Sequence, residues 1–173
     1  MVNNEAILMP PEPGLEAQIQ ELAARMREAQ NVVVLSGAGC STDSGIPDYR
    51  GPTTRHKERN PVKYLPFVQK PEVRQRYWGR AMVGWPWFSS REPNETHRIL
   101  ARLEASGAIS GIITQNVDRL HHKAGSRNVL ELHGALAEVG CLECGALEAR
   151  DAYQQRLLEA NPHMEAQLVE FAP

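Results

Sequence analysis

The sequence has few cysteines, little net charge and no long hydrophobic run. Its three cysteines among 173 residues argue against a disulfide framework, because such a framework needs pairs. No apolar run approaches the roughly 20 residues that a bilayer-spanning helix needs, so we expect no membrane partner. The formal net charge is −2 with acidic and basic residues interspersed. That distribution offers no basic face for nucleic acid.

The N-terminal segment also lacks the features of a secretion signal. Residues 1–14 contain Glu5 but no Lys or Arg, and their apolar stretch, residues 6–9, is too short for the core of a signal peptide. We therefore expect a cytoplasmic protein. Its composition, 42% hydrophobic and 23% charged, is typical of one globular unit. A small molecule or a peptide is the expected ligand.

Three short apolar runs, residues 32–35, 112–114 and 129–132, each predict a buried strand of a parallel sheet. Glycine or polar residues follow each run, at 36–39, 115–118 and 133–134. In an open α/β sheet, ligands bind outside the carboxyl ends of the strands. We therefore expect these three segments to meet at one edge of the sheet and to form the binding site.

The segment between the first two runs predicts inserted helices. Its roughly 75 residues are too many for a single crossover helix and include several prolines, so we expect a helical or flap insertion at about residues 50–93. Apolar residues recur at helical spacing over 15–29, and Asn94 is a typical N-cap for a helix that continues through Leu103. The predicted fold class is α/β, with a parallel Rossmann-like sheet.

A glycine turn follows the first predicted strand. Gly37 and Gly39 would let the backbone approach a ligand phosphate closely. Thr42 stands where the dehydrogenase fingerprint requires a third glycine, and Pro47 prevents an uninterrupted helix. The turn therefore indicates a dinucleotide site that opens into a loop, and not a site built for hydride transfer. An ordinary glycine-rich connection is the alternative.

Three motifs in the chain resemble the signatures of the sirtuin family. Residues 37–50, GAGCSTDSGIPDYR, resemble the family's cofactor-binding signature. Residues 114–118, TQNVD, resemble its second signature, and residues 132–134, LHG, resemble its third. The resemblance runs from about Ala29 to Gly145. Residues 77–94 resemble the branch that includes a mitochondrial animal sirtuin and many bacterial relatives.

The resemblance implies an enzyme that consumes NAD as a co-substrate to remove acyl groups from protein lysine. In sirtuins the acyl-lysine carbonyl oxygen attacks C1′ of the nicotinamide ribose, nicotinamide leaves, and the acyl group ends on ADP-ribose. A base must then deprotonate a ribose hydroxyl, and histidine suits this step because its ordinary pKa of about 6.5 leaves much of it neutral at pH 7. By resemblance His133 is that base, and Asn116 is a second catalytic residue.

The resemblance also implies where NAD is held. Asp118 and Ile46 would form the nicotinamide pocket, while Gln115 and Asn116 would face the ribose. For the two short polar side chains, Asn116 and Asp118, an Asx turn at a strand end is the alternative. The other expected NAD contacts are Gly37, Ala38, Gly39, Ser41, Asp48, Tyr49 and Arg50. Among these, Arg50 would be the charged partner of the pyrophosphate or else a solvated side chain, and Asp48 would order the loop.

Tyr77 and Arg80 are three residues apart on a predicted helix and so share one face. Sirtuins that prefer acidic acyl groups hold the distal carboxylate with a Tyr and an Arg at this spacing, although such pairs also recur by chance. The aromatic residues at 85–88 are expected in the core, and a platform for a ligand is the alternative. Cys40 lies inside the glycine turn, where we expect a position at which the family tolerates many residue types; a reactive thiol is the alternative. Structural or surface roles are expected for His97, His121 and His122.

Cys141 and Cys144, with glycines beside them, predict the first half of a zinc knuckle. A tetrahedral structural site needs four ligands, and the family supplies a second Cys pair further on, whereas residues 146–173 contain no cysteine. An isolated thiol-redox pair is the alternative. We expect residues 15–140 to be the first part of an NAD-binding domain and 141–173 the start of a zinc module. The sequence, residues 1–173, is then a truncated form of the catalytic domain.

The predicted activity is that of an NAD-dependent protein deacetylase or deacylase, a transferase that releases nicotinamide and acyl-ADP-ribose. Its expected partners are NAD, a structural Zn²⁺ and an acyl-lysine protein or peptide. Two alternatives stay open. One is a module that binds NAD or ADP-ribose without turnover, and the other is a protein ADP-ribosyltransferase.

Overall fold

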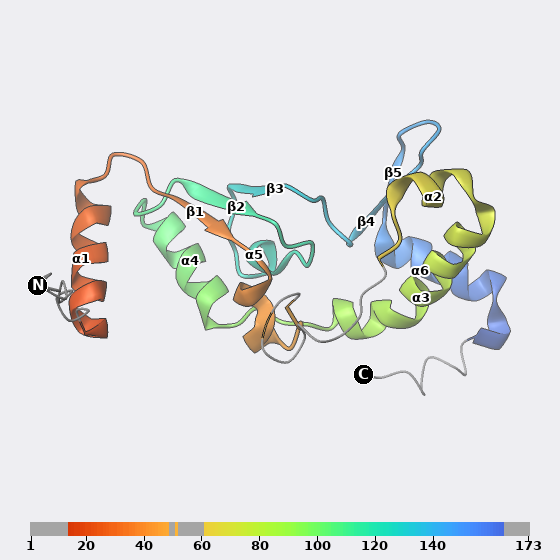
Figure 1. Cartoon of the computed structure of the whole chain (residues 1–173), viewed down its shortest axis with the longest axis horizontal. Helices are drawn as coiled ribbons and strands as arrows, with labels where there is room; N and C mark the ends of the chain where they lie inside the picture. The colour runs from red at the N-terminus through yellow and green to blue at the C-terminus, as the bar shows by residue number, and fades with distance from the viewer. Residues whose placement is uncertain (1–13, 49–50, 52–60, 165–173) are drawn as a thin grey trace, which may run out of the picture. The chain divides into compact units, whose positions relative to one another are not determined.

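The computed structural model describes residues 14–48, 51 and 61–164, and the chain divides into two compact units, Met1–Val32 and Val33–Pro173. Figure 1 shows the elements in chain order. They are α1 (Leu15–Glu28), β1 (Val33–Ser36), the 3-10 helix η1 (Ala38–Ser44), α2 (Tyr64–Gln69), α3 (Pro71–Ser89), α4 (Glu95–Ala105), β2 (Gly111–Thr114), α5 (Leu120–Lys123), β3 (Val129–Glu131), β4 (Glu138–Gly140), β5 (Leu147–Ala149) and α6 (Arg150–Ala160).

The first unit contains α1, which matches the helix predicted over residues 15–29. The helix has an acidic residue, Glu16, in its first turn and basic residues, Arg25 and Arg27, in its last turn. This arrangement complements the helix dipole. Arg25 also pairs with Glu21 one turn earlier. Exposed i,i+4 pairs of this kind add a few tenths of a kcal/mol each.

A three-stranded parallel sheet forms the centre of the second unit, in the order β1-β2-β3. Ser36 lies opposite Thr114, and Thr114 lies opposite Glu131, so the three strands end at the same level. The Ser36 hydroxyl donates a hydrogen bond to Thr114 Oγ1 at 2.8 Å. The predicted parallel Rossmann-like arrangement, with the three strand ends at one edge, is confirmed.

Two helices pack against each other beside this sheet, α4 and α5. The predicted N-cap is confirmed, because the Asn94 side chain accepts the backbone N–H of His97. The apolar core here includes Ile112 of β2 and Leu120 of α5, each 1% exposed. Burial of such side chains contributes roughly 2 kcal/mol each. His121 Nε2 of α5 also lies 2.8 Å from the Ser36 hydroxyl, which ties α5 to the end of β1.

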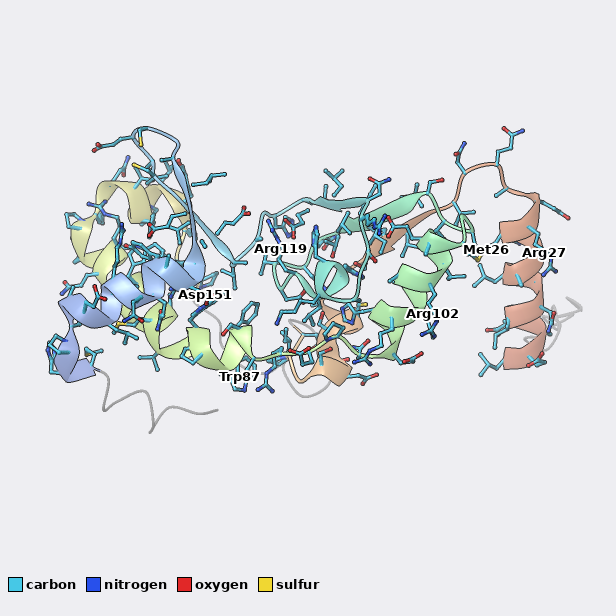
Figure 2. The ribbon with its side chains drawn as sticks, turned by 180° about the vertical axis from the view of Figure 1, so that it is seen from behind. Met26, Arg27, Trp87, Arg102, Arg119 and Asp151 are labelled. Atoms are coloured by element: carbon cyan, nitrogen blue, oxygen red, sulfur yellow. The ribbon has the colours of Figure 1, made fainter. Side chains whose placement is uncertain are left out.

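The inserted helices α2 and α3 lie within the stretch where an insertion was predicted. Pro86 lies inside α3, so that proline does not end the helix. Helix α3 packs on α6: Trp85 Nε1 donates to Asp151 Oδ1 at 2.7 Å, and Gln154 Nε2 donates to the carbonyl of Met82 at 2.8 Å. Asp151 is labelled in Figure 2, at the start of α6.

Strands β4 and β5 form a separate antiparallel pair just before α6. The boundary that we placed between residues 140 and 141 falls at the end of β4, inside this hairpin, and remains a prediction. None of the helices in the described ranges combines the length and hydrophobicity that a bilayer span requires.

Candidate active site

A cavity of about 560 Å³ lies at the carboxyl ends of the sheet strands. Its wall combines η1 and the loop after it with the segments that follow β2 and β3. Seven of the residues predicted to bind NAD or act in catalysis line it: Ala38, Ser41, Ile46, Gln115, Asn116, Asp118 and His133. The fold thus brings together three segments that are up to about a hundred residues apart in the chain.

Asn116 is held rigidly at the edge of this cavity. Its side chain is 7% exposed, and Nδ2 donates to the Gly37 carbonyl and to Ser41 Oγ at 3.1 Å each. These two bonds use both amide hydrogens, so Oδ1 is the atom left to accept a hydrogen bond from a ligand. The backbone N–H of Asn116 donates to Thr114 Oγ1, which ties the loop to the strand.

Asp118 is held by hydrogen bonds to both of its carboxylate oxygens. The Ser41 hydroxyl donates to Oδ2 at 2.7 Å, and the Leu120 N–H donates to Oδ1 at 2.9 Å. The second bond is an Asx turn, the alternative considered for this residue, and it coexists with the position of Asp118 in the cavity wall. The turn therefore orients the carboxylate toward Ser41 and the cavity.

His133 follows β3 and lines the same cavity. Its Nδ1 lies 2.9 Å from the carbonyl oxygen of Gln115. A carbonyl only accepts, so Nδ1 carries the hydrogen and Nε2 of the neutral ring has the lone pair that accepts a proton. Gly134 adopts a φ of 70°, which glycine reaches without strain, and so the chain turns away directly after the histidine.

The remaining predicted NAD contacts are less fully defined. Gly37 contributes its carbonyl to Asn116, and neither it nor Gly39 belongs to the lining of the cavity. Asp48 accepts the N–H of Gly51 at 2.8 Å, which supports the interpretation that it orders the loop. Tyr49 and Arg50 lie outside the described residues.

The family model described as "Sir2 family" matches residues 37–169, most of the chain. The chain belongs to the Sir2 family. The resemblance to sirtuins, which rested on the motifs at residues 37–50, 114–118 and 132–134, is confirmed. All three motifs lie within the matched range and contribute to the cavity wall.

The relatives of this chain include a mitochondrial animal sirtuin and bacterial deacetylases, as expected for the predicted branch of the Sir2 family. A bovine protein named "NAD-dependent protein lipoamidase sirtuin-4, mitochondrial" is 41% identical, over 99% of this chain and 56% of its own length. "NAD-dependent protein deacetylase 1" of Mycobacterium avium is 50% identical, over 84% of this chain and 51% of its own length. The chain thus spans about half the length of these curated relatives.

Solved structures of Sir2 proteins have the same fold. One described as "Sir2-p53 peptide-NAD+" has a TM-score of 0.68 and 38% sequence identity, and the match covers 80% of this chain and 55% of that chain. The α/β fold expected from the apolar runs is therefore confirmed by a structural neighbour as well as by the strand order.

Two aromatic residues in the cavity wall, Trp87 and Phe88, were not predicted as site residues. The cluster at 85–88 was expected in the core, and only its first member, Trp85 at 9% exposure, is buried there. The Arg91 guanidinium lies 4.9 Å from the centre of the Trp87 ring. An aromatic run in a helix does not indicate which of its members faces a cavity, so the sequence held no signal for this difference.

A second, smaller cavity of about 290 Å³ lies among aromatic residues of α3. Tyr77 lines it, whereas Arg80 is exposed and does not. Arg150 is the arginine that lines this cavity; its guanidinium is 5.0 Å from the centre of the Trp85 ring. The pairing of Tyr77 with Arg80 on an acyl carboxylate remains a prediction that this arrangement does not support directly.

Cys141 and Cys144 lie in the turn between β4 and β5, which is closed by hydrogen bonds from Gly145 N–H to the Cys141 carbonyl and from Cys141 N–H to the Ala146 carbonyl. The pKa of Cys141 is lowered, chiefly by the backbone N–H of Cys144 and then by that of Glu143. A lowered pKa favours the thiolate that binds metals. Within the part of the chain that the structure describes, no third ligand side chain joins these two.

Proposed function

We propose that the chain carries the nicotinamide end of an NAD-dependent protein-lysine deacylase, a transferase that uses NAD as co-substrate. One observation carries the proposal. His133, oriented by its Nδ1–H bond to the Gln115 carbonyl, shares a cavity with Asn116 and Asp118. The relatives named as NAD-dependent deacetylases and the neighbour described with NAD and a p53 peptide support it.

In this proposal the fixed polar groups recognise the nicotinamide ribosyl end of NAD. Asn116 Oδ1 accepts from a ribose hydroxyl or an amide of the ligand, because Nδ2 is already bonded within the protein. Asp118 lies beside it and, with Ile46, forms the nicotinamide pocket. Trp87 and Phe88 provide flat apolar surface on the same wall.

His133 moves the proton in the proposed reaction. The acyl-lysine oxygen attacks C1′ of the nicotinamide ribose, and nicotinamide leaves. His133 Nε2 then takes the proton of a ribose hydroxyl, while Nδ1 keeps its own hydrogen bonded to the Gln115 carbonyl. That second hydrogen bond stabilises the imidazolium that forms, as a carbonyl or carboxylate partner does in other histidine bases.

We further propose that Cys141 and Cys144 supply two thiolates to a structural Zn²⁺. The turn fits this half-site, because it brings both sulfurs together and its N–H groups favour the thiolate form of Cys141. The bound ion would cross-link the tip of the β4–β5 hairpin. A cytoplasmic location, expected from the sequence, remains a prediction.

The test is nicotinamide release from NAD in the presence of an acyl-lysine peptide, measured for this chain and for the whole product of its gene. Replacing His133 by Ala should lower net release over many turnovers by roughly 10²- to 10⁴-fold, the usual contribution of a general base, because a turnover is completed only after the base has acted. His163→Ala is the matched control, because His163 is an exposed histidine that does not line the cavity.

The products separate the proposed activity from its alternatives. Formation of acyl-ADP-ribose indicates deacylation, whereas transfer of label from NAD to protein indicates ADP-ribosylation. Binding of NAD without nicotinamide release by the whole gene product would make the protein a binding module. Unchanged multiple-turnover release by His133→Ala would refute the assignment of the base.

A further inference from the structure

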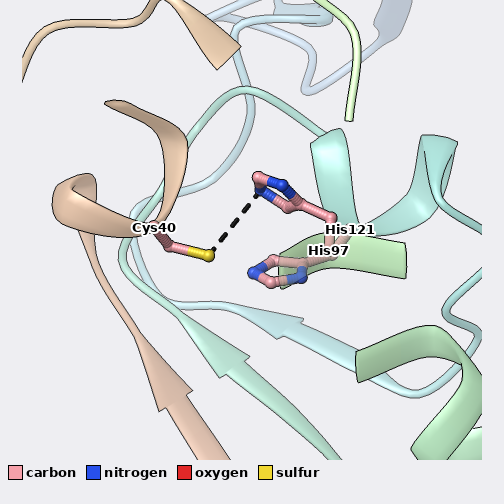
Figure 3. A group of neighbouring side chains, drawn as sticks. All are labelled: Cys40, His97 and His121. Carbon is pink, nitrogen blue, oxygen red and sulfur yellow. Dashed lines mark hydrogen bonds between the residues drawn. The ribbon is translucent and has the colours of Figure 1, made fainter. Parts of the chain in front are cut away.

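Three side chains with no role in the proposed reaction gather behind the glycine turn: Cys40 of η1, His97 of α4 and His121 of α5 (Figure 3). Cys40 Sγ lies 3.8 Å from His97 Nε2, and the centres of the two imidazole rings are 4.8 Å apart. One ligand atom from each residue lies within 4.8 Å of those of the other two. We refer to these residues as the Cys-His-His cluster.

The hydrogen bonds of His97 leave its Nε2 with a lone pair that points toward the thiol. Asn94 Nδ2 donates to the Cys40 carbonyl at 2.8 Å, which fixes the orientation of the amide. Asn94 Oδ1 is 2.9 Å from His97 Nδ1, and the Asn94 N–H is 3.3 Å from the same atom. The shorter contact joins an oxygen to Nδ1, so it is favourable only if Nδ1 carries the hydrogen.

The hydrogen bonds of His121 also leave one ring nitrogen with a lone pair. The Ser36 hydroxyl gives its hydrogen to Thr114 Oγ1, so it accepts a hydrogen bond from His121 Nε2 at 2.8 Å. The other nitrogen, Nδ1, is buried and has no hydrogen-bond partner. His121 is only 2% exposed, so water does not readily satisfy this lone pair.

Both histidines of the cluster are neutral and therefore suited to metal binding. Burial lowers the pKa of His121 to about 4, although the negative charge of Asp118 opposes the shift. The pKa of His97 is lowered for the same reason. Burial and Asp118 raise the pKa of the Cys40 thiol, so without a metal this thiol is protonated at neutral pH.

We propose that the Cys-His-His cluster binds Zn²⁺. One thiolate and two imidazoles are a ligand set that zinc prefers, and a tetrahedral ion with these ligands has ligand-to-ligand distances of about 3.3 to 3.6 Å. The Sγ to Nε2 distance of 3.8 Å is close to that value, and the other two distances, which are within 4.8 Å, need a contraction of at most about 1.5 Å. Binding displaces the Cys40 proton to solvent, and water takes the fourth position.

An ion at this cluster would act on the NAD cavity through η1. Cys40 lies on η1 between Ala38 and Ser41, and both of these residues line the cavity. Drawing Cys40 toward α4 and α5 moves this wall and disturbs the bond from Ser41 to Asp118. Zinc at the cluster is therefore inhibitory, and this consequence, unlike the binding itself, rests on the proposed function.

Cobalt titration tests the binding directly, because Co²⁺ adopts the zinc geometry and a thiolate ligand gives it a strong charge-transfer band in the near ultraviolet. The titrated protein carries Cys141→Ser and Cys144→Ser, which leaves Cys40 as its one thiol. We expect the band to saturate at one Co²⁺ per chain and Cys40→Ser in the same background to abolish it. A band that survives Cys40→Ser in the folded protein, or no band at all, would overturn the proposal.

The histidines are tested by substitution with glutamine, which fills similar space. His97→Gln and His121→Gln should each weaken Co²⁺ binding roughly tenfold or more. His122→Gln is the matched control, since His122 neighbours the cluster in sequence and instead faces Glu131. If the double cysteine variant does not fold, the native chain is titrated, and Cys40→Ser must then remove part of the thiolate absorbance. No change would refute the site.

The inhibitory consequence has its own measurement. One equivalent of Zn²⁺ at the cluster should lower nicotinamide release by the whole gene product at least several-fold, and Cys40→Ser should remove that sensitivity. Full occupancy with unchanged release would contradict the inhibition while leaving the site intact. Absence of release from a protein whose structural zinc is bound and whose Cys-His-His cluster is empty would contradict the proposed function instead.

Discussion

Two polar side chains at the strand ends, Asn116 and His133, are fixed by hydrogen bonds within the protein that leave one atom for a ligand. Asn116 keeps Oδ1, and His133 keeps Nε2. The motifs predicted which residue types gather here, but they could not predict these partners. The partners come from segments far away in the chain, such as Ser41 for Asp118.

Loss of the Nδ2 hydrogen-bond donor of Asn116 should destabilise the fold. In Asn116→Asp a carboxylate oxygen would face the Gly37 carbonyl, and both amide hydrogen bonds would be lost. We expect the free energy of unfolding to fall by roughly 1 to 3 kcal/mol, as for other buried groups left without a partner. Urea denaturation measures this loss.

The neighbouring amide provides the control for that substitution. Gln115 is exposed, so Gln115→Glu should change the free energy of unfolding by less than about 0.5 kcal/mol. Equal losses in the two variants would show that added negative charge, and not the geometry of Asn116, causes the effect.

At the scale of elements, α3 and α6 are joined by a buried arginine. Arg150 is 4% exposed, donates to the Ala81 carbonyl at 3.1 Å and lies against the rings of Trp78 and Trp85. Its pKa is lowered, first by burial. The side chain therefore stabilises the contact between the helices largely through packing on the aromatic rings.

Removing Arg150 should loosen this pair of helices. Arg150→Ala should lower the free energy of unfolding by about 2 to 3 kcal/mol, because it deletes a packed side chain and a hydrogen bond to a carbonyl. Arg156 lies over the ring of Tyr153 but is largely exposed, so Arg156→Ala should lower the free energy of unfolding by less than about 1 kcal/mol. Thermal denaturation of both variants makes the comparison, and a similar cost for the two would contradict it.

Elements with a strong local pattern were predictable from the sequence, and elements that depend on tertiary contacts were not. The positions of β1, β2 and β3 and the capped start of α4 match the expectation. The burial predicted for all three strands is correct only for β2, since Leu35 of β1 and Leu130 of β3 are exposed on the outer strands of the sheet. The short helix α5 and the hairpin β4–β5 were not predicted. Helix α5 is held by contacts from elsewhere in the chain, such as the bond from Lys123 Nζ to the Ser89 carbonyl. The hairpin is closed at its base by the bond from Arg150 N–H to the Ala137 carbonyl and packs against α6.

At the scale of the whole molecule, the buried histidine His121 of the Cys-His-His cluster should make the free energy of unfolding depend on pH. The pKa of His121 is about 4 in the folded protein, with burial as the main cause and His97 and His122 adding to it against Asp118, whereas the ordinary value is 6.5. Between these values the unfolded chain binds more protons than the folded chain. The free energy of unfolding should therefore fall as the pH drops from about 6.5 to 4, by roughly 2 to 3 kcal/mol in total.

Urea denaturation at pH 7.5, 6 and 5 measures this dependence. The variant His121→Gln has no titrating group at this position, so its free energy of unfolding should vary less over the same range. A wild-type slope that the variant reproduces in full would mean that other groups control the acid sensitivity.

At the scale of the whole molecule, motifs in the sequence could predict some features of the folded chain and not others. Family membership, the parallel sheet and the cavity residues His133, Asn116 and Asp118 followed from three motifs at strand ends. The Cys-His-His cluster did not, because its members come from three elements whose packing no local pattern encodes. Residues that were each expected to be structural or tolerant thus form a site only in the folded chain.

The most direct test of the central claim is a comparison of two reactions in His133→Ala of the whole gene product: exchange of labelled nicotinamide into NAD, and formation of acyl-ADP-ribose. His133 is proposed to act after nicotinamide leaves. The variant should therefore keep its exchange rate within a few-fold of the wild-type protein and lose acyl-ADP-ribose formation by roughly 10²- to 10⁴-fold. Equal loss of both reactions, or loss of neither, would contradict the account.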